Sequence, residues 1–184
     1  MITLKRILTP TDFSTISVPA IGYALSLAKQ LDAEVTVLHA LPKTETKGQL
    51  LNQYAAGDLA GPGAAMSIGS QPNFDDIFDR KKRVLVSFLE ERISKELLRS
   101  VKVNPVIKAG KVTEEIVAVA KEEQCDLIVM TSHGGRLRKL LHGGFTDRVI
   151  RQAPCPVLSI QPWTEIRTEE NKRTAVKFIE KWAA

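Results

Sequence analysis

The sequence of 184 residues has few of the features that mark several large classes of protein. It contains two cysteines, three histidines and 5% aromatic residues. Two thiols do not make a disulfide framework, and no cysteines and histidines cluster with the spacing of a zinc site. We therefore expect Cys125 and Cys155, each beside an apolar run, to be free thiols that are buried or half-buried.

Long apolar runs are also missing, because none approaches the roughly 20 residues that a membrane span requires. The first residues, MITLKRIL, place basic side chains inside a predicted strand, and no small-residue cleavage site follows. These observations predict no membrane association and, by default, a cytoplasmic location.

The net charge of +5 is modest, and lysine and arginine alternate with acids in most segments. Only residues 136–142 are basic without acids. Because no helix-turn-helix or RNA-binding signature is present, we expect no nucleic-acid partner.

Short apolar runs alternate with amphipathic stretches along the chain, which is typical of a parallel sheet with helical crossovers. The prediction is an α/β, Rossmann-like fold with three layers: a five-stranded parallel sheet with helices on both faces. We expect strands at 4–9, 34–41, 101–110, 125–130 and 157–161, and helices from 14 or 17 to 31, at 74–100, from 113, and after Gly144. Pro105 argues that the third strand lies at an edge.

Two segments lie outside this alternation. Residues 42–73, rich in Gly, Ala, Ser and Pro, form a long insertion, either a lid over a site or a disordered connection. Residues 163–184 form a C-terminal helical extension to a domain spanning 1–162. An apolar stripe at Ala175, Phe178, Ile179 and Trp182 predicts that this extension docks on its own domain or across a dimer.

A glycine-rich loop follows the fourth strand. Thr131 is followed by His133 and Gly134, and Gly143-Gly144 then opens a helix. Free backbone N–H groups and the helix dipole can together hold an anion in such a loop.

Pro10, Thr11 and Asp12 follow the first strand, and ligands of doubly wound sheets bind outside the carboxyl ends of the strands. Asp12 can cap a turn, accept a ligand hydroxyl, or do both. His39, inside the second strand, is interpreted as a satisfied core histidine.

Three stretches resemble the universal stress protein family, and the resemblance covers nearly the whole chain: ILTPTDFS (7–14), DLIVM (126–130) with its following HG (133–134), and RVIRQAPCPVL (148–158). The resemblance implies the strand order 3-2-1-4-5. It also implies a homodimer, through antiparallel pairing of strand 5 at Val157 to Gln161. One branch of the family binds ATP through G-x2-G-x9-G-[ST], and another branch lacks the motif and does not bind ATP.

The motif is altered in this chain. Thr131 occupies its first glycine position and Gly134 its second, and the closing pair falls on Gly143-Gly144 with eight residues between Gly134 and Gly143. A second register closes the motif at Gly144, which restores nine residues but places Phe145 in the hydroxyl position. Thr146 retains a hydroxyl nearby, and Arg136 adds positive charge.

By family position, adenine would lie against the backbone of Ala40 and Met130, and Asp12 would meet the ribose. The expected ligand is ATP with Mg²⁺, or a related nucleotide. The predicted site comprises Pro10, Thr11, Asp12, Ala40, Met130, Thr131, His133, Gly134, Arg136, Gly143, Gly144, Phe145 and Thr146.

Two functions stay open at this point. The first is a stress-response module that binds a nucleotide in the crevice between strands 1 and 4. The alternative is a dimeric scaffold that binds no nucleotide and contacts an unknown protein partner. The sequence assigns no catalytic residue, because no paired general base and nucleophile is present; slow ATP hydrolysis near His133 is the most that we expect.

Overall fold

The computed structural model describes residues 3–41, 74–132 and 144–161. Strands and helices alternate along them, as the sequence predicts. In chain order they are β1 (Arg6–Pro10), α1 (Val18–Leu31), β2 (Glu34–Leu41), α3 (Phe74–Arg92), α4 (Lys95–Ser100), β3 (Lys102–Ala109), α5 (Val112–Glu122), β4 (Leu127–Thr131), α6 (Phe145–Gln152) and β5 (Val157–Ile160). The insertion at 42–73 and the extension at 163–184 lie outside the described residues, so their predicted roles stay predictions.

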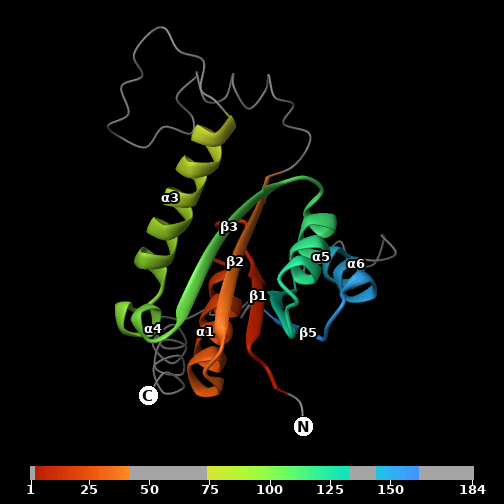
Figure 1. Cartoon of the computed structure of the whole chain (residues 1–184), viewed down its shortest axis with the longest axis horizontal. Coiled ribbons are helices and arrows are strands. Elements are labelled where there is room, and N and C mark those ends of the chain that lie inside the picture. Colours follow the sequence, from red (N-terminus) through yellow and green to blue (C-terminus); the bar gives the residue numbers. More distant parts are fainter. Residues whose placement is uncertain (1–2, 42–73, 133–143, 162–184) are drawn as a thin grey trace, which may run out of the picture.

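The described strands form one parallel sheet in the order β3-β2-β1-β4-β5, which confirms the predicted fold (Figure 1). Ile7 of β1 lies opposite Val35 of β2 on one side and Leu127 of β4 on the other. β1 is thus central. The strand order reverses between β1 and β4, where ligands bind in sheets of this kind.

Helices cover both faces of the sheet, with α1, α3 and α4 on one side and α5 and α6 on the other (Figure 1). Successive strand residues point to opposite faces. Ile7, Val35 and Val129 accordingly pack in the cluster beneath α1, α3 and α4. Leu8 and Ile128, each one residue along from a member of the first cluster, pack with α5 and α6. These two apolar layers hold the carboxyl ends of the strands in place.

The predicted helix at 74–100 is two helices. Ser94 adopts an extended conformation (φ −60°, ψ 137°), and its side chain accepts a hydrogen bond from the Leu97 backbone N–H at 3.3 Å. A serine hydroxyl that caps a new helix start competes with continuing the old one. Ile93 and Leu97, on either side of the break, are both buried, so the break keeps the apolar face on the core.

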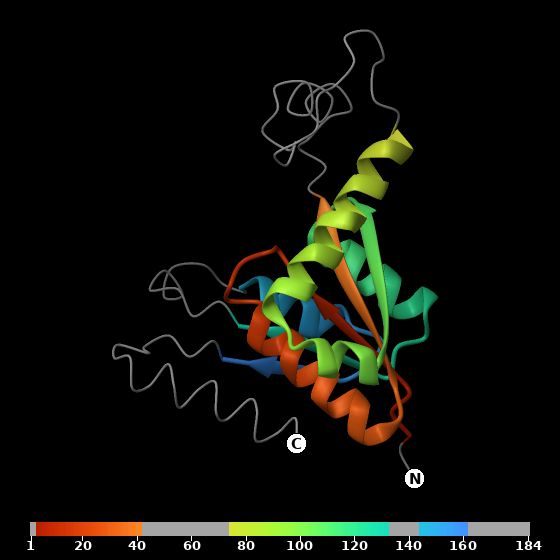
Figure 2. The same cartoon turned by 90° about the vertical axis from the view of Figure 1, so that its left-hand side faces the viewer.

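α3 extends past the sheet at the end where β2 and β3 terminate (Figure 2). Its buried residues Ile77, Leu85 and Leu89 recur at helical spacing, and the last two belong to the first core cluster. The first turns of α3 therefore lie at the carboxyl edge of the sheet, where β1 and β4 also end.

Both cysteines in the described residues are free thiols, as predicted; Cys125 is buried and Cys155 is half-buried. Burial raises the pKa of Cys125 to about 12, so this thiol stays protonated at neutral pH. No helix in the described ranges is long and apolar enough to cross a membrane.

Candidate functional site

The end of β1 remains attached to β2 as the chain leaves the sheet. The Thr11 backbone N–H, one residue past the end of the strand, donates to the Leu38 carbonyl at 2.8 Å. Pro10 is the last strand residue. The loop that begins at Thr11 is therefore fixed relative to the sheet.

The Thr11 hydroxyl connects this loop to the start of α1. Its oxygen accepts from the Phe13 backbone N–H at 3.1 Å and lies 2.7 Å from the Ser17 hydroxyl oxygen. The Ser17 hydroxyl donates to the Ser14 carbonyl at 2.8 Å. Because Ser17 has only one hydroxyl proton, Thr11 must be the donor in the bond between the two hydroxyls. Residues 11–17 thus form one hydrogen-bonded turn.

Asp12 is exposed at the outer side of this turn. Its Oδ1 accepts from the Ser14 backbone N–H at 3.0 Å and from the Ser14 hydroxyl at 2.5 Å. Asp12 caps the turn and does not cap α1, which begins after Ser17. This capping places a carboxylate at the carboxyl edge of the sheet, so the capping and ligand-binding roles are compatible.

Phe13, a residue that the sequence prediction overlooked, has left-handed backbone with φ 63°. This region disfavours bulky side chains and often marks a functional turn. Its ring centroid lies 4.1 Å from that of His39 and 5.6 Å from that of Phe88, the second pair being edge-to-face. The only sequence signal was a large apolar residue between Asp12 and Ser14, where a turn favours smaller ones.

His39 lies half-buried beneath Phe13, and its Nδ1 lies 2.8 Å from the Thr11 carbonyl oxygen. A carbonyl only accepts, so Nδ1 carries the proton. The prediction that His39 has a hydrogen-bond partner is confirmed, but the residue is half-buried and its partner belongs to the site loop. Burial lowers the pKa of His39, the Thr11 bond raises it, Lys81 lowers it and Asp12 raises it.

The end of β4 presents mainly backbone atoms to the candidate site, because its side chains are buried. Met130 is 2% exposed and belongs to the cluster under α5 and α6, and Thr131 is 5% exposed. The Ser132 backbone N–H donates to Ile160 at 2.9 Å, which continues the ladder past the strand. On β2, Ala40 is 9% exposed. Only their backbones and the Ala40 methyl group could contact a ligand, as the adenine prediction requires.

The N-terminus of α6 differs from its prediction as an open set of N–H donors. The Gly144 N–H donates to Oδ2 of Asp147 at 3.2 Å, so one of these donors is already engaged. The ring of Phe145 packs against the cluster under α5 and α6, which leaves only its backbone toward the loop. Thr146 is half-buried. The Asp147 carboxylate thus engages one of the backbone donors that were expected to hold an anion.

Gly144 is the N-cap of α6, with φ −56° and ψ 167°. This is the position at which serine and threonine are favoured, as the first of the two registers requires. Among the described residues, a Cβ built there would meet only Asp147 Oδ2, at 3.9 Å. The conformation and space therefore accept a serine. His133, Gly134, Arg136 and Gly143 lie outside the described residues.

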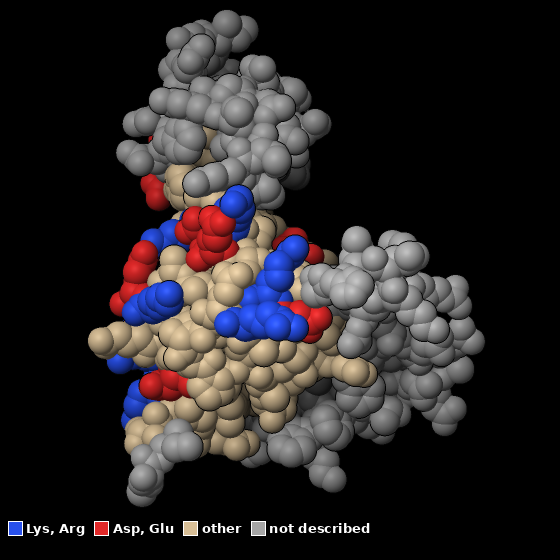
Figure 3. Space-filling model, turned by 90° about the vertical axis from the view of Figure 1, so that its right-hand side faces the viewer, with Lys and Arg blue, Asp and Glu red and all other residues tan. Residues whose placement is uncertain are grey.

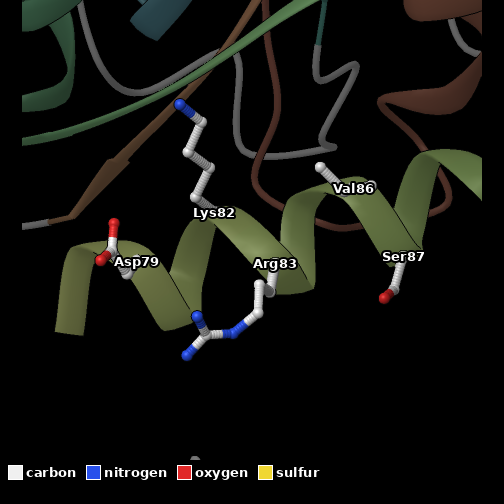
Figure 4. Close-up of a pocket in the computed structure, with 5 residues that line it drawn as sticks. All are labelled: Asp79, Lys82, Arg83, Val86 and Ser87. Atoms are coloured by element: carbon white, nitrogen blue, oxygen red, sulfur yellow. The ribbon is translucent and has the colours of Figure 1, made fainter. Parts of the chain in front are cut away.

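Two other surface features of the described residues differ from this site. An open hollow is lined by Asp79, Lys82, Arg83, Val86 and Ser87, which all come from α3 (Figure 4). On the side that carries α5 and α6, acidic and basic side chains are intermixed (Figure 3). No group of three or more His, Cys, Asp or Glu among the described residues could hold a metal ion.

The sequence pattern of the universal stress protein family matches residues 3–161. The chain belongs to the universal stress protein family. It is 31% identical to universal stress protein MJ0577 of Methanocaldococcus jannaschii over 159 residues, covering 85% of this chain and 94% of that protein. Universal stress protein MJ0531 of the same organism is 30% identical over 158 residues, with 85% and 82% covered.

Solved structures of this family have the same fold. The structure of MJ0577 superposes with a TM-score of 0.58 at 27% identity, covering 89% of this chain and 99% of the other. A universal stress protein in complex with cAMP superposes with a TM-score of 0.52 at 17% identity, covering 87% of this chain and 98% of that one. Within this family fold, Asp12 follows β1 and Thr131 ends the neighbouring β4.

Proposed function

We propose that this universal stress protein binds an adenine nucleotide, ATP with Mg²⁺, in the crevice between β1 and β4. The observation that carries the proposal is the adjacency of these strands, which brings the exposed Asp12 and the backbone after Met130 to one edge. Asp12 would accept a ribose hydroxyl, and the α6 N-terminus would face the phosphates. The complex of a relative with cAMP supports only that this fold can hold an adenine nucleotide.

The affinity is expected to be modest for two reasons. Gly144 supplies no hydroxyl where the family motif has one, and a lost hydrogen bond is worth about 0.5 to 1.5 kcal/mol, or about tenfold in affinity. The Asp147 carboxylate, bonded to the Gly144 N–H, also repels phosphate from the same helix terminus. Removing this charge in Asp147→Asn should tighten binding.

Titration calorimetry with ATP and Mg²⁺, with thermal shift in parallel, tests the proposal. Asp12→Asn should weaken binding by about tenfold, since it replaces a charged acceptor with a neutral one. Asp79→Asn, on the outer hollow of α3, is the matched control and should bind as the wild type does. If millimolar nucleotide produced no binding heat and no thermal shift, the proposal would be contradicted.

A dimeric scaffold is the second function that the fold supports, because β5 lies at an edge of the sheet. The N–H groups of Ile128 and Ser132 donate to the carbonyls of Pro156 and Ile160. Backbone groups alternate sides along a strand, so those of Ser159 point outward from the sheet. Antiparallel pairing of two such edges would form a homodimer at Val157 to Gln161, whether or not nucleotide is bound.

Light scattering after size exclusion tests the dimer. Ser159→Pro removes an outward donor and leaves the bonds to β4 intact, so it should shift a dimer to monomer. Ser159→Ala, the control, should stay dimeric. A dimer that persists in Ser159→Pro would exclude this interface.

We place the protein in the cytoplasm, since both of its cysteines are free thiols, as in a reducing compartment. Cell fractionation checks this location. The proposal assigns no hydrolytic step to any described residue. A basal ATPase rate that is unchanged in His133→Ala would argue against catalysis by that histidine.

A further inference from the structure

We propose that His39 and Phe13 are positioning residues for Asp12, and that protonation of His39 weakens ligand binding by releasing the loop. The proposal rests on the proposed function to the extent that Asp12 contacts the nucleotide. It adds two residues that the site prediction did not contain, and it makes the site sensitive to pH.

One imidazole contacts both chain neighbours of Asp12. On the preceding side, Nδ1 lies 2.8 Å from the Thr11 carbonyl oxygen. On the following side, the ring lies 4.1 Å from the ring of Phe13, at an interplanar angle of 35°. Asp12 itself is exposed and reaches its position because the residues on each side of it are held to β2.

The conformation of Phe13 depends on these ring contacts. Its φ of 63° is unfavourable for an aromatic residue, so tertiary contacts must hold it there. The contacts are the stack on His39 and the edge-to-face pair with Phe88 of α3, at 5.6 Å between centroids. If either ring moves away, the local hydrogen bonds of Thr11 and Asp12 remain, but a tertiary contact that offsets the unfavourable φ of Phe13 is lost.

Protonation acts on this assembly through Nε2, because Nδ1 already carries a proton in the neutral ring. The charged groups that act on the ring are Lys81 of α3, which opposes a positive imidazole, and Asp12, which favours one. Burial opposes a charged ring most strongly, whereas the hydrogen bond to the Thr11 carbonyl favours one. A charged His39 is therefore better accommodated when the loop opens and water reaches the ring, which moves Asp12 out of place.

Three variants separate the contributions of His39 and Phe13. His39→Asn keeps an N–H donor near the Nδ1 position but cannot titrate. His39→Phe keeps an aromatic ring for stacking and loses the donor. Phe13→Gly tolerates the left-handed backbone and loses the stack. Asp79→Asn again serves as the control outside the crevice.

The experiment measures ATP–Mg²⁺ affinity by calorimetry at about pH 7.5 and about pH 5.5, which bracket the ordinary imidazole pKa. Comparing proteins at each pH cancels the titration of the nucleotide itself. On acidification, we expect the ATP affinity of the wild type to fall about threefold more than that of His39→Asn. At neutral pH, the affinity of Phe13→Gly should be about tenfold lower than that of the wild type. An equal loss in the wild type and His39→Asn would overturn the proposal.

A ligand-free measurement separates this inference from the proposed function. The Ser14 amide donates to Asp12, so its NMR shift reports the turn. It should titrate together with the His39 ring in the wild type and stay constant in His39→Asn. If ATP binds at neither pH, the proposed function fails and this titration alone tests the inference. A Ser14 amide shift that does not change as the His39 ring titrates would overturn the inference.

Discussion

The Nδ1 atom of His39 lies 2.8 Å from the carbonyl oxygen of Thr11, although 28 residues separate them in sequence. This bond joins the interior of β2 to the loop that carries Asp12 after β1. A side chain that looks purely structural in the sequence therefore lies next to the candidate site. Its protonation state affects both the stability of the fold and the shape of the loop.

The first prediction concerns stability and pH. Burial lowers the pKa of His39 below its ordinary value of 6.5, so the unfolded chain binds more protons than the folded one as pH falls through 6.5. The contribution of His39 to the free energy of unfolding is complete above pH 6.5 and is lost on acidification. Denaturant titrations should show this loss in the wild type and a smaller one in His39→Asn. If the free energy of unfolding fell equally with pH in the wild type and in His39→Asn, the prediction would be contradicted.

The second prediction compares two substitutions of Phe13. Both Phe13→Gly and Phe13→Ala lose the ring contacts with His39 and Phe88. Alanine must also adopt the left-handed φ, which costs about 1 to 2 kcal/mol. Glycine adopts the same φ without this cost. The free energy of unfolding of Phe13→Ala should therefore be about 1 kcal/mol lower than that of Phe13→Gly. The opposite order would show that the turn relaxes when the ring is removed.

The third prediction concerns two buried threonines in neighbouring strands. Thr9 is 0% exposed, and its hydroxyl has no hydrogen-bond partner in the part of the chain that the structure describes. The Thr36 hydroxyl, 5% exposed, donates to Oε2 of Glu123 at 2.5 Å. Thr9→Val should raise the free energy of unfolding by about 1 kcal/mol, and Thr36→Val should lower it by about the same.

Chemical denaturation of both variants at one pH checks this pair, and each serves as the control for the other. A loss of stability in Thr9→Val would show that its hydroxyl is satisfied in solution. A Thr36→Val protein as stable as the wild type would mean that the bond to Glu123 contributes nothing net.

The fourth prediction restores the hydroxyl that the family motif carries. Gly144→Ser fits, because the nearest atom that a Cβ there meets in the described part of the chain is an Asp147 carboxylate oxygen at 3.9 Å, and the backbone φ is −56°. One added hydrogen bond to a phosphate should tighten ATP binding by about tenfold. Gly144→Ala adds the same Cβ without the hydroxyl and should leave the affinity unchanged. Equal affinities in the two variants would exclude position 144 from the phosphate site.

Much of the fold could be predicted from the sequence, because each strand is a short apolar run with clear breaks. β2 has the predicted limits, Glu34 to Leu41, since its apolar residues are buried on both faces of the sheet. The strand order required the family resemblance, because local pattern does not determine which strands pair. The break at Ser94 was missed because helical spacing continues across it from Ile93 to Leu97.

The candidate site was less predictable, because its contacts are between residues of different elements. Asp12 could be recognised from its place after β1. The stack of Phe13 on His39 could not, since no local pattern pairs a loop residue with the interior of another strand. The bond from Gly144 to Asp147 is local, but its effect on an incoming anion follows only from its place at the start of α6.

The Asp147 carboxylate also bears on how the protein would respond to its ligand. In the ligand-free protein the terminus of α6 already holds a resident anion through the Gly144 N–H. A nucleotide that binds there exchanges one anion for another, so its net free energy of binding is a difference between two similar terms.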